Sequence, residues 1–292
     1  KGCMNPREID WNRVWADQVL RHRSANNGMD CALYWEKKKR ARQYWDCARA
    51  TQTRRIEKTM EDLPITPESR VLDIGAGPGV LSIPIARKAA AVTAVDPSQG
   101  MISVLEEKAA EEGLDNISTV RKKWEDVDPE TDLDGPFDIV VASFCIGGIT
   151  DIRSALKKME QAADGSIFVY WFASEPSWED CSRRLIPALH GQEHHPMPNC
   201  EVLHNVLYSM DIHPNVSVFE YEHIDRFHSY EEAVDYFMDR YNASTPEQEK
   251  VIREYLDEHI EKLEGDLALR YPTTCLKMWW EKHGSLRVAA RR

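Results

Sequence analysis

The stretch VLDIGAGPGVLSIPIA, residues 71–86, sets three glycines between a short apolar run and a second apolar pattern with helical spacing. Gly75, Gly77 and Gly79 stand at alternate positions, directly after an expected strand over residues 71–74. Glycine has no Cβ, so it allows a backbone to turn tightly and to approach a ligand closely. A glycine-rich turn between a first strand and a helix therefore predicts a ligand site at the carboxyl edge of a sheet.

The sequence that follows alternates expected strands and helices. Strands are expected over residues 91–96, 117–120, 137–143 and 166–173, and helices up to about residue 87, over 99–112 and over 152–163. The strand segments are almost continuously apolar, which is typical of parallel strands covered on both faces. We therefore predict an α/β fold, with a mostly parallel sheet and helices on both of its faces.

Other segments flank this α/β region. Helices are expected over 7–24 and 30–61, separated by a break at Asn26–Gly28. After Pro176 we expect helical stretches within 177–211, a strand over 216–224, helices over 229–242 and 246–264, and a last strand over 274–280. These boundaries predict an N-terminal helical lid over 1–62, a ligand-binding core over 63–175, and a C-terminal part over 176–292 that completes the sheet and carries a helical cap.

Composition excludes several classes of protein. The net charge is −12, but residues 1–62 hold 14 Lys and Arg against 9 Asp and Glu, so the excess of acid lies in the rest of the chain. An acidic body disfavours non-specific binding of nucleic acid or anionic membrane. The basic run Lys37–Arg42 is interpreted as the solvated face of a helix whose other face carries Tyr34, Trp35, Ala41, Tyr44 and Trp45. No nucleic-acid or membrane partner is expected.

Cysteine usage and hydropathy indicate the compartment. Seven cysteines occur without a CxxC pair, and no apolar run approaches the roughly 20 residues that span a bilayer. The basic, tryptophan-containing start does not resemble a signal peptide. We therefore expect a reduced, cytoplasmic protein without a disulfide framework.

The residues around the glycine turn discriminate among possible ligands. No Lys-Ser or Lys-Thr pair follows, which excludes a phosphate-binding P-loop. A dinucleotide fingerprint would need glycine where Val80 stands, and Pro78 removes an N–H from the turn. Asp73, two residues before the first glycine, can brace the loop and face an ammonium group of the ligand. Asp96 ends the second expected strand, where a carboxylate can accept both hydroxyls of a ribose.

The pattern VLDIGAGPG, AVDPSQGM, WEDVD and FDIVVAS, in this order and spacing, resembles the class I S-adenosylmethionine-dependent methyltransferases, over about residues 65–173. The resemblance implies a Rossmann-like core, a seven-stranded sheet whose last two strands are an antiparallel pair, and S-adenosylmethionine as the cofactor. Met101 would offer an apolar surface to the adenine, and Trp124, Glu125 or Asp126 would read it. The residues expected to bind the cofactor are Asp73, Gly75, Ala76, Gly77, Gly79, Asp96, Pro97, Ser98, Met101, Trp124, Glu125 and Ser143.

Methyl transfer from a sulfonium requires mainly an aligned acceptor and the exclusion of water. The segment after residue 143 lacks the motifs of nucleic-acid amino methylases and of cytosine C5 enzymes, so Cys145 is interpreted as a small buried residue. The polar segment His190–His204 is expected to be a cap loop that binds no metal, because Pro196 and Pro198 interrupt the helical spacing of His190 and His194. These two histidines are the candidate general bases.

The sequence therefore predicts a methyltransferase whose acceptor is a small molecule or an exposed protein side chain. Two alternatives remain open. One is a catalytically silent protein of the same fold that binds the cofactor and acts through a partner. The other, which the glycine pattern favours less, is a nicotinamide dehydrogenase.

Overall fold

The computed structural model describes residues 8–25 and 31–282. The expected break at residues 26–28 lies outside this range. The helices are α1 (Trp11–Ala25), α2 (Cys31–Trp35), α3 (Lys38–Thr51), α4 (Thr53–Asp62), α5 (Ser82–Ala86), α6 (Gln99–Glu111), α7 (Ile152–Ala162), α8 (Glu179–His190), α9 (Cys200–Ser209), α10 (Tyr230–Arg240) and α11 (Pro246–His259). The strands are β1 (Arg70–Ile74), β2 (Ala91–Val95), β3 (Ile117–Val120), β4 (Phe137–Ser143), β5 (Ala163–Phe172), β6 (Asn215–Phe227), β7 (Glu261–Leu263) and β8 (Asp266–Glu281).

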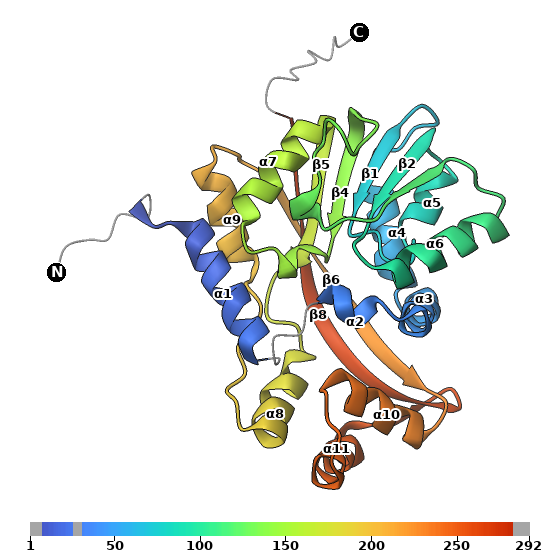
Figure 1. Ribbon diagram of the computed structural model, residues 1–292, viewed down its shortest axis with the longest axis vertical. Helices are drawn as coiled ribbons and strands as arrows, with labels where there is room; N and C mark the ends of the chain where they lie inside the picture. Colours follow the sequence, from blue (N-terminus) through green and yellow to red (C-terminus); the bar gives the residue numbers. More distant parts are fainter. Residues whose placement is uncertain (1–7, 26–30, 283–292) are drawn as a thin grey trace.

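The strands form one mostly parallel sheet, as predicted. Its order is β3-β2-β1-β4-β5-β8-β6, and β8 runs antiparallel to both β5 and β6. The sheet has eight strands because the short β7 pairs with the start of β8, which the sequence did not predict. Figure 1 shows the parallel strands at the top of the molecule, with β6 and β8 running down to α10 and α11.

Alternate residues of the central strands supply two apolar layers. In β5, Ile167, Val169 and Trp171 pack with residues of α1, α7 and α9, whereas Phe168 and Tyr170 pack with residues of α3 to α6. This is the period of two expected of a strand that is buried on both faces. The near-continuous apolar runs in the sequence are thus explained, as predicted, by strands that are buried on both faces.

The N-terminal helices belong to these layers. Trp15 of α1 is fully buried and its Nε1 donates to the carbonyl of Ile149, while Ala41 and Trp45 of α3 pack against the other face. The prediction of one helix over 30–61 is wrong, because the chain turns after Trp35 and again at Gln52, giving α2, α3 and α4. These turns let the segment follow the curved surface of the sheet and its neighbour α6.

The antiparallel strand pair of β6 and β8 extends beyond the rest of the sheet. Phe172, the last residue of β5, is level with Cys275 of β8 and thus with Phe219 of β6, yet β6 continues to Phe227. A separate apolar cluster of α8, α10 and α11 packs on this extension. The predicted helix over 246–264 ends instead at His259, because the chain turns back at Gly265 to pair β7 with β8.

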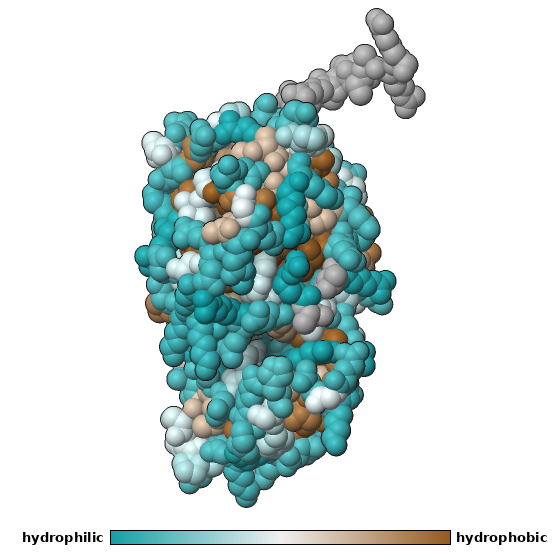
Figure 2. Space-filling view, turned by 90° about the vertical axis from the view of Figure 1, so that its right-hand side faces the viewer, coloured by the Kyte–Doolittle hydropathy of each residue, from teal (hydrophilic) through white to brown (hydrophobic). Residues whose placement is uncertain are grey.

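The basic run Lys37–Arg42 makes ion pairs within the protein. Lys38 and Arg42 both pair with Glu107 of α6, and Arg40 pairs with Asp239 of α10. The face on this side is largely hydrophilic, with apolar residues scattered among polar ones (Figure 2). The basic residues of α3 thus lie on its polar side, and Ala41 and Trp45 lie in the core as expected, whereas Tyr34 and Trp35 belong to α2 and not to the same helix. Over residues 8–25 and 31–282, none of the helices has the length and apolar character needed to cross a membrane.

Candidate functional site

The three glycines of the turn after β1 have different surroundings. All three have positive φ, at 66°, 57° and 90°, where a side chain is strained. A Cβ on Gly75 would lie 2.2 Å from the Cβ of Cys145, and one on Gly79 would lie 2.9 Å from Leu105. A Cβ on Gly77 would meet nothing within 4 Å. Two glycines thus allow close packing of the protein, whereas Gly77 faces open space where a ligand can pass.

Asp73 lies beneath this turn. The side chain is buried, and its Oδ2 accepts a 2.6 Å hydrogen bond from the hydroxyl of Ser82. Burial raises the pKa of Asp73 to about 7, and the nearby charge of Asp96 adds to this shift, whereas the Ser82 hydrogen bond opposes it. A buried carboxylate with so few donors favours a cationic group beside it, because a positive charge stabilises the ionised form.

Asp96 follows β2 and closes the other side of the turn. Its two carboxylate oxygens accept hydrogen bonds from the backbone N–H of Gly77 and of Ser98, each 2.9 Å long. Burial nevertheless raises the pKa of this carboxyl above its ordinary value. Pro97 and Ser98 then lead into α6, where the Ser98 hydroxyl caps the helix by accepting from Met101 N–H. Asp96 therefore fixes the turn, and its remaining lone pairs are available to a ligand's hydroxyls.

Some predicted cofactor residues have structural contacts of their own. Met101 is buried in the layer under α3, and Ala76 packs with Ala94 and Leu105. Trp124 is only 4% exposed and its Nε1 donates to the carbonyl of Ala155, so the indole is part of the core and does not form an open platform. Glu125 is exposed beside it. Either Glu125 or the neighbouring backbone is thus the more accessible group on that side.

A buried arginine that the sequence analysis missed lies at the end of β4. The guanidinium of Arg55, from α4, donates to Ser143 Oγ over 3.2 Å and to Gln52 Oε1 over 2.7 and 3.1 Å. It also lies over the ring of Phe144, 5.2 Å from the centroid. Its charge lowers the pKa of Asp73, opposing the effect of burial. Nothing in the local sequence distinguishes Arg55 from its neighbour Arg54, which is exposed.

Gln52 extends this hydrogen-bond network to the β6–β8 strand pair. Its Nε2 lies 3.3 Å from Nδ1 of His223, and Nε2 of His223 lies 3.0 Å from Oδ1 of the buried Asp225. Because Gln52 Oε1 already accepts from Arg55, its amide nitrogen faces His223, which makes Nδ1 the acceptor and Nε2–H the donor. Burial raises the pKa of Asp225, but the charges of His223 and Arg240 outweigh this effect and the pKa is lowered.

Aromatic side chains connect the ends of β4 and β5 to β6 of the same strand pair. Phe144 contacts Phe172 and Tyr221, Phe172 contacts Trp178, and Trp178 contacts His223, with ring centroids 4.9 to 6.2 Å apart. Tyr221 and His223 are two residues apart on β6 and so share one face of the strand. We call these five residues the aromatic wall. It lies beyond the carboxyl edge of the sheet, on the side of the glycine turn.

The histidines proposed from the sequence have contacts within the cap. Helix α8 ends at His190, and Gly191 adopts a left-handed conformation, so His190 and His194 do not share a helix face. His190 Nε2 donates to the carbonyl of Tyr241 over 2.8 Å, and His194 pairs with Glu179. Cys145 lies against Gly75, its Sγ donates to the carbonyl of Ile74, and burial raises its pKa. This agrees with the structural role expected for Cys145.

Comparison with known proteins identifies the core. A family model described as a methyltransferase domain matches residues 71–164, which include the glycine turn, Asp96 and β4. This match identifies residues 71–164 as a methyltransferase domain of the class I S-adenosylmethionine-dependent type. A crystal structure of a putative methyltransferase from Bacillus halodurans superposes with a TM-score of 0.54 at 16% identity, covering 78% of this chain and 98% of that chain. That similarity concerns the fold alone.

The curated relatives match part of this chain. An uncharacterised protein of Haemophilus influenzae is 27% identical over 166 residues, covering 57% of this chain and 59% of that protein. A ubiquinone biosynthesis O-methyltransferase of Bradyrhizobium diazoefficiens is 34% identical, covering 36% of this chain and 40% of that protein. A 23S rRNA (uracil(1939)-C(5))-methyltransferase of Shewanella sediminis is 32% identical, covering 37% and 24%. The matches thus span about a quarter to three fifths of the relatives' length.

The cofactor of this methyltransferase is S-adenosylmethionine, and the residues of the turn fit it. Open space at Gly77 admits a ligand to the backbone, buried Asp73 suits a cationic group, and Asp96 suits ribose hydroxyls. When bound, the cofactor supplies a methyl group on a positively charged sulfonium. The chain's own residues then have to orient the acceptor, exclude water and, for some acceptors, accept a proton.

Proposed function

We propose that this methyltransferase acts on a small molecule or a single exposed protein side chain, held between the carboxyl edge of the sheet and the helical cap. The observation that carries this proposal is the extension of β6 beyond the level of Phe172, together with the aromatic wall that it completes. Aromatic faces with a few polar groups are typical of sites for compact ligands. The acidic body of the chain disfavours a long polyanionic acceptor.

The N-terminal segment takes part in the same site in this proposal. Residues 1–62 act as a lid in which Gln52, between α3 and α4, and Arg55 of α4 reach the end of β4. The core over 63–175 binds the cofactor, and the part over 176–292 supplies Trp178, His223 and the cap helices. Enclosing the acceptor between these three parts excludes water, which in-line methyl transfer from a sulfonium requires.

For an acceptor that must lose a proton, His223 is the base that this geometry favours. The carboxylate of Asp225 orients the ring through Nε2–H, which leaves the lone pair on Nδ1 toward Gln52 and the aromatic wall. An acceptor hydroxyl or ammonium group would take the place of the Gln52 amide at Nδ1. The roles of His190 and His194 as bases stay predictions of the sequence.

Incubation with methyl-labelled S-adenosylmethionine and an extract of the source organism tests the acceptor class. Label is expected in the small-molecule or the protein fraction, together with stoichiometric S-adenosylhomocysteine. Label in RNA would contradict the proposed acceptor. Cofactor binding without turnover on any fraction would favour the catalytically silent alternative, and a failure to bind the cofactor would contradict both.

Substitution of His223 tests the base. With the labelled acceptor, His223→Gln is expected to lower kcat and to change the pH profile of kcat, while cofactor affinity stays unchanged. The matched control is His228→Gln, because His228 is exposed directly after β6 and its ring pairs only with Asp266 in the contacts of the described residues. His190→Ala provides the comparison with the sequence prediction. Equal pH profiles for His223→Gln and the wild type would exclude His223 as the base.

A further inference from the structure

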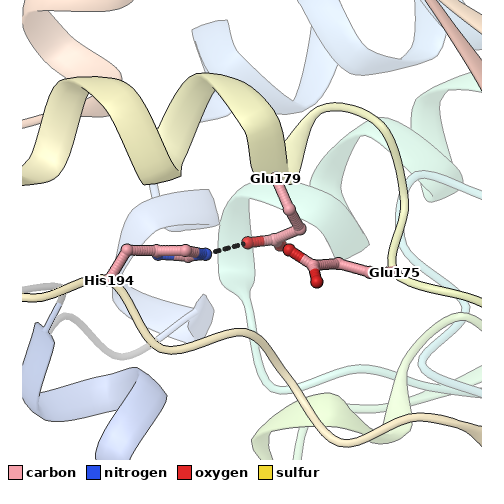
Figure 3. A group of neighbouring side chains, drawn as sticks. All are labelled: Glu175, Glu179 and His194. Carbon is pink, nitrogen blue, oxygen red and sulfur yellow. Dashed lines mark ion pairs between the residues drawn. The ribbon is translucent and has the colours of Figure 1, made fainter.

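Glu175, Glu179 and His194 form a cluster of three side chains that can bind a metal, and all three lie outside the glycine turn and its neighbours. Glu179 is in the first turn of α8, Glu175 is in the loop before it, and His194 is in the loop after it. Figure 3 shows the His194 ring and the two carboxylates directed toward one another from these three segments. One ligand atom from each residue lies within 4.8 Å of the other two.

The contacts of the cluster leave ligand atoms unused. His194 Nε2 and Glu179 Oε2 are 2.7 Å apart, yet neither atom makes a hydrogen bond of good geometry within the described residues, and the same holds for His194 Nδ1. The two side chains are only 2% and 5% exposed. Buried polar atoms without hydrogen bonds are rare in folded proteins because each costs its desolvation free energy. An additional partner for these atoms would remove that cost.

The electrostatics of the cluster favour a cation as that partner. Two carboxylates lie close together, and a buried pair of like charges is unfavourable unless a cation compensates it. Arg183 pairs with one oxygen of Glu175 and with Asp180, and it lies on the more exposed side of the cluster. The ring of His22 lies edge-on to that of His194, with centroids 6.3 Å apart. Neither of these groups neutralises the buried Glu179.

We propose that Glu175, Glu179 and His194 bind one divalent transition-metal ion, and that this ion joins the two loops that flank α8. One imidazole and two carboxylates are ligands that suit Zn²⁺ and its neighbours better than Mg²⁺ or Ca²⁺. Ligands at about 2.0–2.2 Å from one ion lie about 3–4.4 Å apart. Binding therefore requires a small opening of the 2.7 Å contact and a small inward movement of Glu175, the most exposed member.

The position of the cluster gives the ion a structural consequence. Trp178 of the aromatic wall stands immediately before Glu179 and packs on Phe172 and His223. An ion at Glu175 and Glu179 would hold the loop that carries Trp178, and His194 would connect it to the loop before α9. The sequence predicts no metal here, because Pro196 and Pro198 interrupt the helical spacing of His190 and His194, whereas folding places His194 beside Glu179.

Metal binding by the full chain, measured without S-adenosylmethionine, tests this inference independently of the proposed function. Zn²⁺ is titrated by calorimetry, and Co²⁺ by its absorption, because thiolate ligands give an intense charge-transfer band that nitrogen and oxygen ligands lack. One ion per chain is expected, without a thiolate band, and the melting temperature is expected to rise with Zn²⁺. Glu179→Gln and His194→Gln are each expected to weaken binding by at least about 10–100-fold.

Matched variants keep the test decisive. Glu193→Gln and His204→Ala change an exposed carboxylate and an exposed imidazole of the same region and are expected to leave binding unchanged. Glu175→Gln alters the partly exposed ligand, so it serves if the two buried substitutions prevent folding, and it is expected to weaken binding as well. Absence of binding in the wild type would overturn the proposal. A thiolate band, or equal affinity in Glu175→Gln and the wild type, would also overturn it.

Discussion

Replacing Gly75 and Gly77 separately by alanine distinguishes packing of the protein from binding of the cofactor. Both residues have positive φ, so each substitution carries a backbone cost of about 1–2 kcal/mol. The Cβ of Gly77→Ala would meet no protein atom within 4 Å, whereas that of Gly75→Ala would lie 2.2 Å from Cys145. Overpacking of this kind adds about 1–3 kcal/mol. Gly75→Ala therefore loses about 2–5 kcal/mol, a large share of a typical stability of about 5–15 kcal/mol.

Gly77→Ala is expected to show the opposite pattern. Its melting temperature should fall by only about 2–8 °C, given about 2–4 °C per kcal/mol for a chain of this size. The added methyl group would instead meet the bound cofactor. A clash of about 1–3 kcal/mol in the complex weakens affinity by about 5–150-fold. The methyl group also lies beside the Gly77 N–H that donates to Asp96, so the substitution disturbs both the turn and the carboxylate expected to bind the ribose.

Differential scanning calorimetry and isothermal titration with S-adenosylhomocysteine measure the two effects on the same preparations. Asp115→Asn, a change at an exposed residue of the loop between α6 and β3, serves as the control for handling and purity. If Gly77→Ala bound the ligand as tightly as the wild type, the cofactor would not pass over Gly77. The fit of the turn to S-adenosylmethionine would then be refuted, even though the family assignment of the fold would stand.

Three further predictions concern charge. Burial raises the pKa of Asp73 from 3.8 to about 7, so the folded protein loses stability as pH rises between these values. Asp73→Asn is therefore expected to melt at a higher temperature than the wild type at pH 8 but not at pH 3.5. An equal difference in melting temperature at both pH values would contradict the raised pKa. Asp96→Ala is expected to weaken cofactor binding by about 1.5–3 kcal/mol, measured by calorimetry, and unchanged affinity would exclude Asp96 from the ribose site. Lys38 and Arg42 both pair with Glu107, so a variant with Lys38→Gln and Arg42→Gln is expected to bind RNA no differently from the wild type in a salt titration. If the wild type bound RNA tightly and this variant did not, the structural role of the two side chains would be contradicted.

The sequence by itself determined the α/β core and its cofactor. The glycine turn, Asp73 and Asp96 lie within one strand–helix–strand unit, where spacing along the chain sets the geometry. The strand boundaries of β1 to β4 were predicted within one residue for the same reason, since apolar runs of this length are read locally. The antiparallel end of the sheet came from the family resemblance, and the structure confirmed it.

Only the tertiary structure decided which side chains meet beyond the ends of β4 and β5. Gln52 and His223 are separated by 171 residues and Arg55 and Ser143 by 88, so no local pattern links them. Trp124 is buried because its hydrogen-bond partner, the carbonyl of Ala155, comes from α7 and lies 31 residues further along the chain. His194 likewise pairs with Glu179 across the whole of α8, not with His190 one turn away. Packing of distant segments fixes these contacts, because burial, not spacing, selects the partner of each polar group.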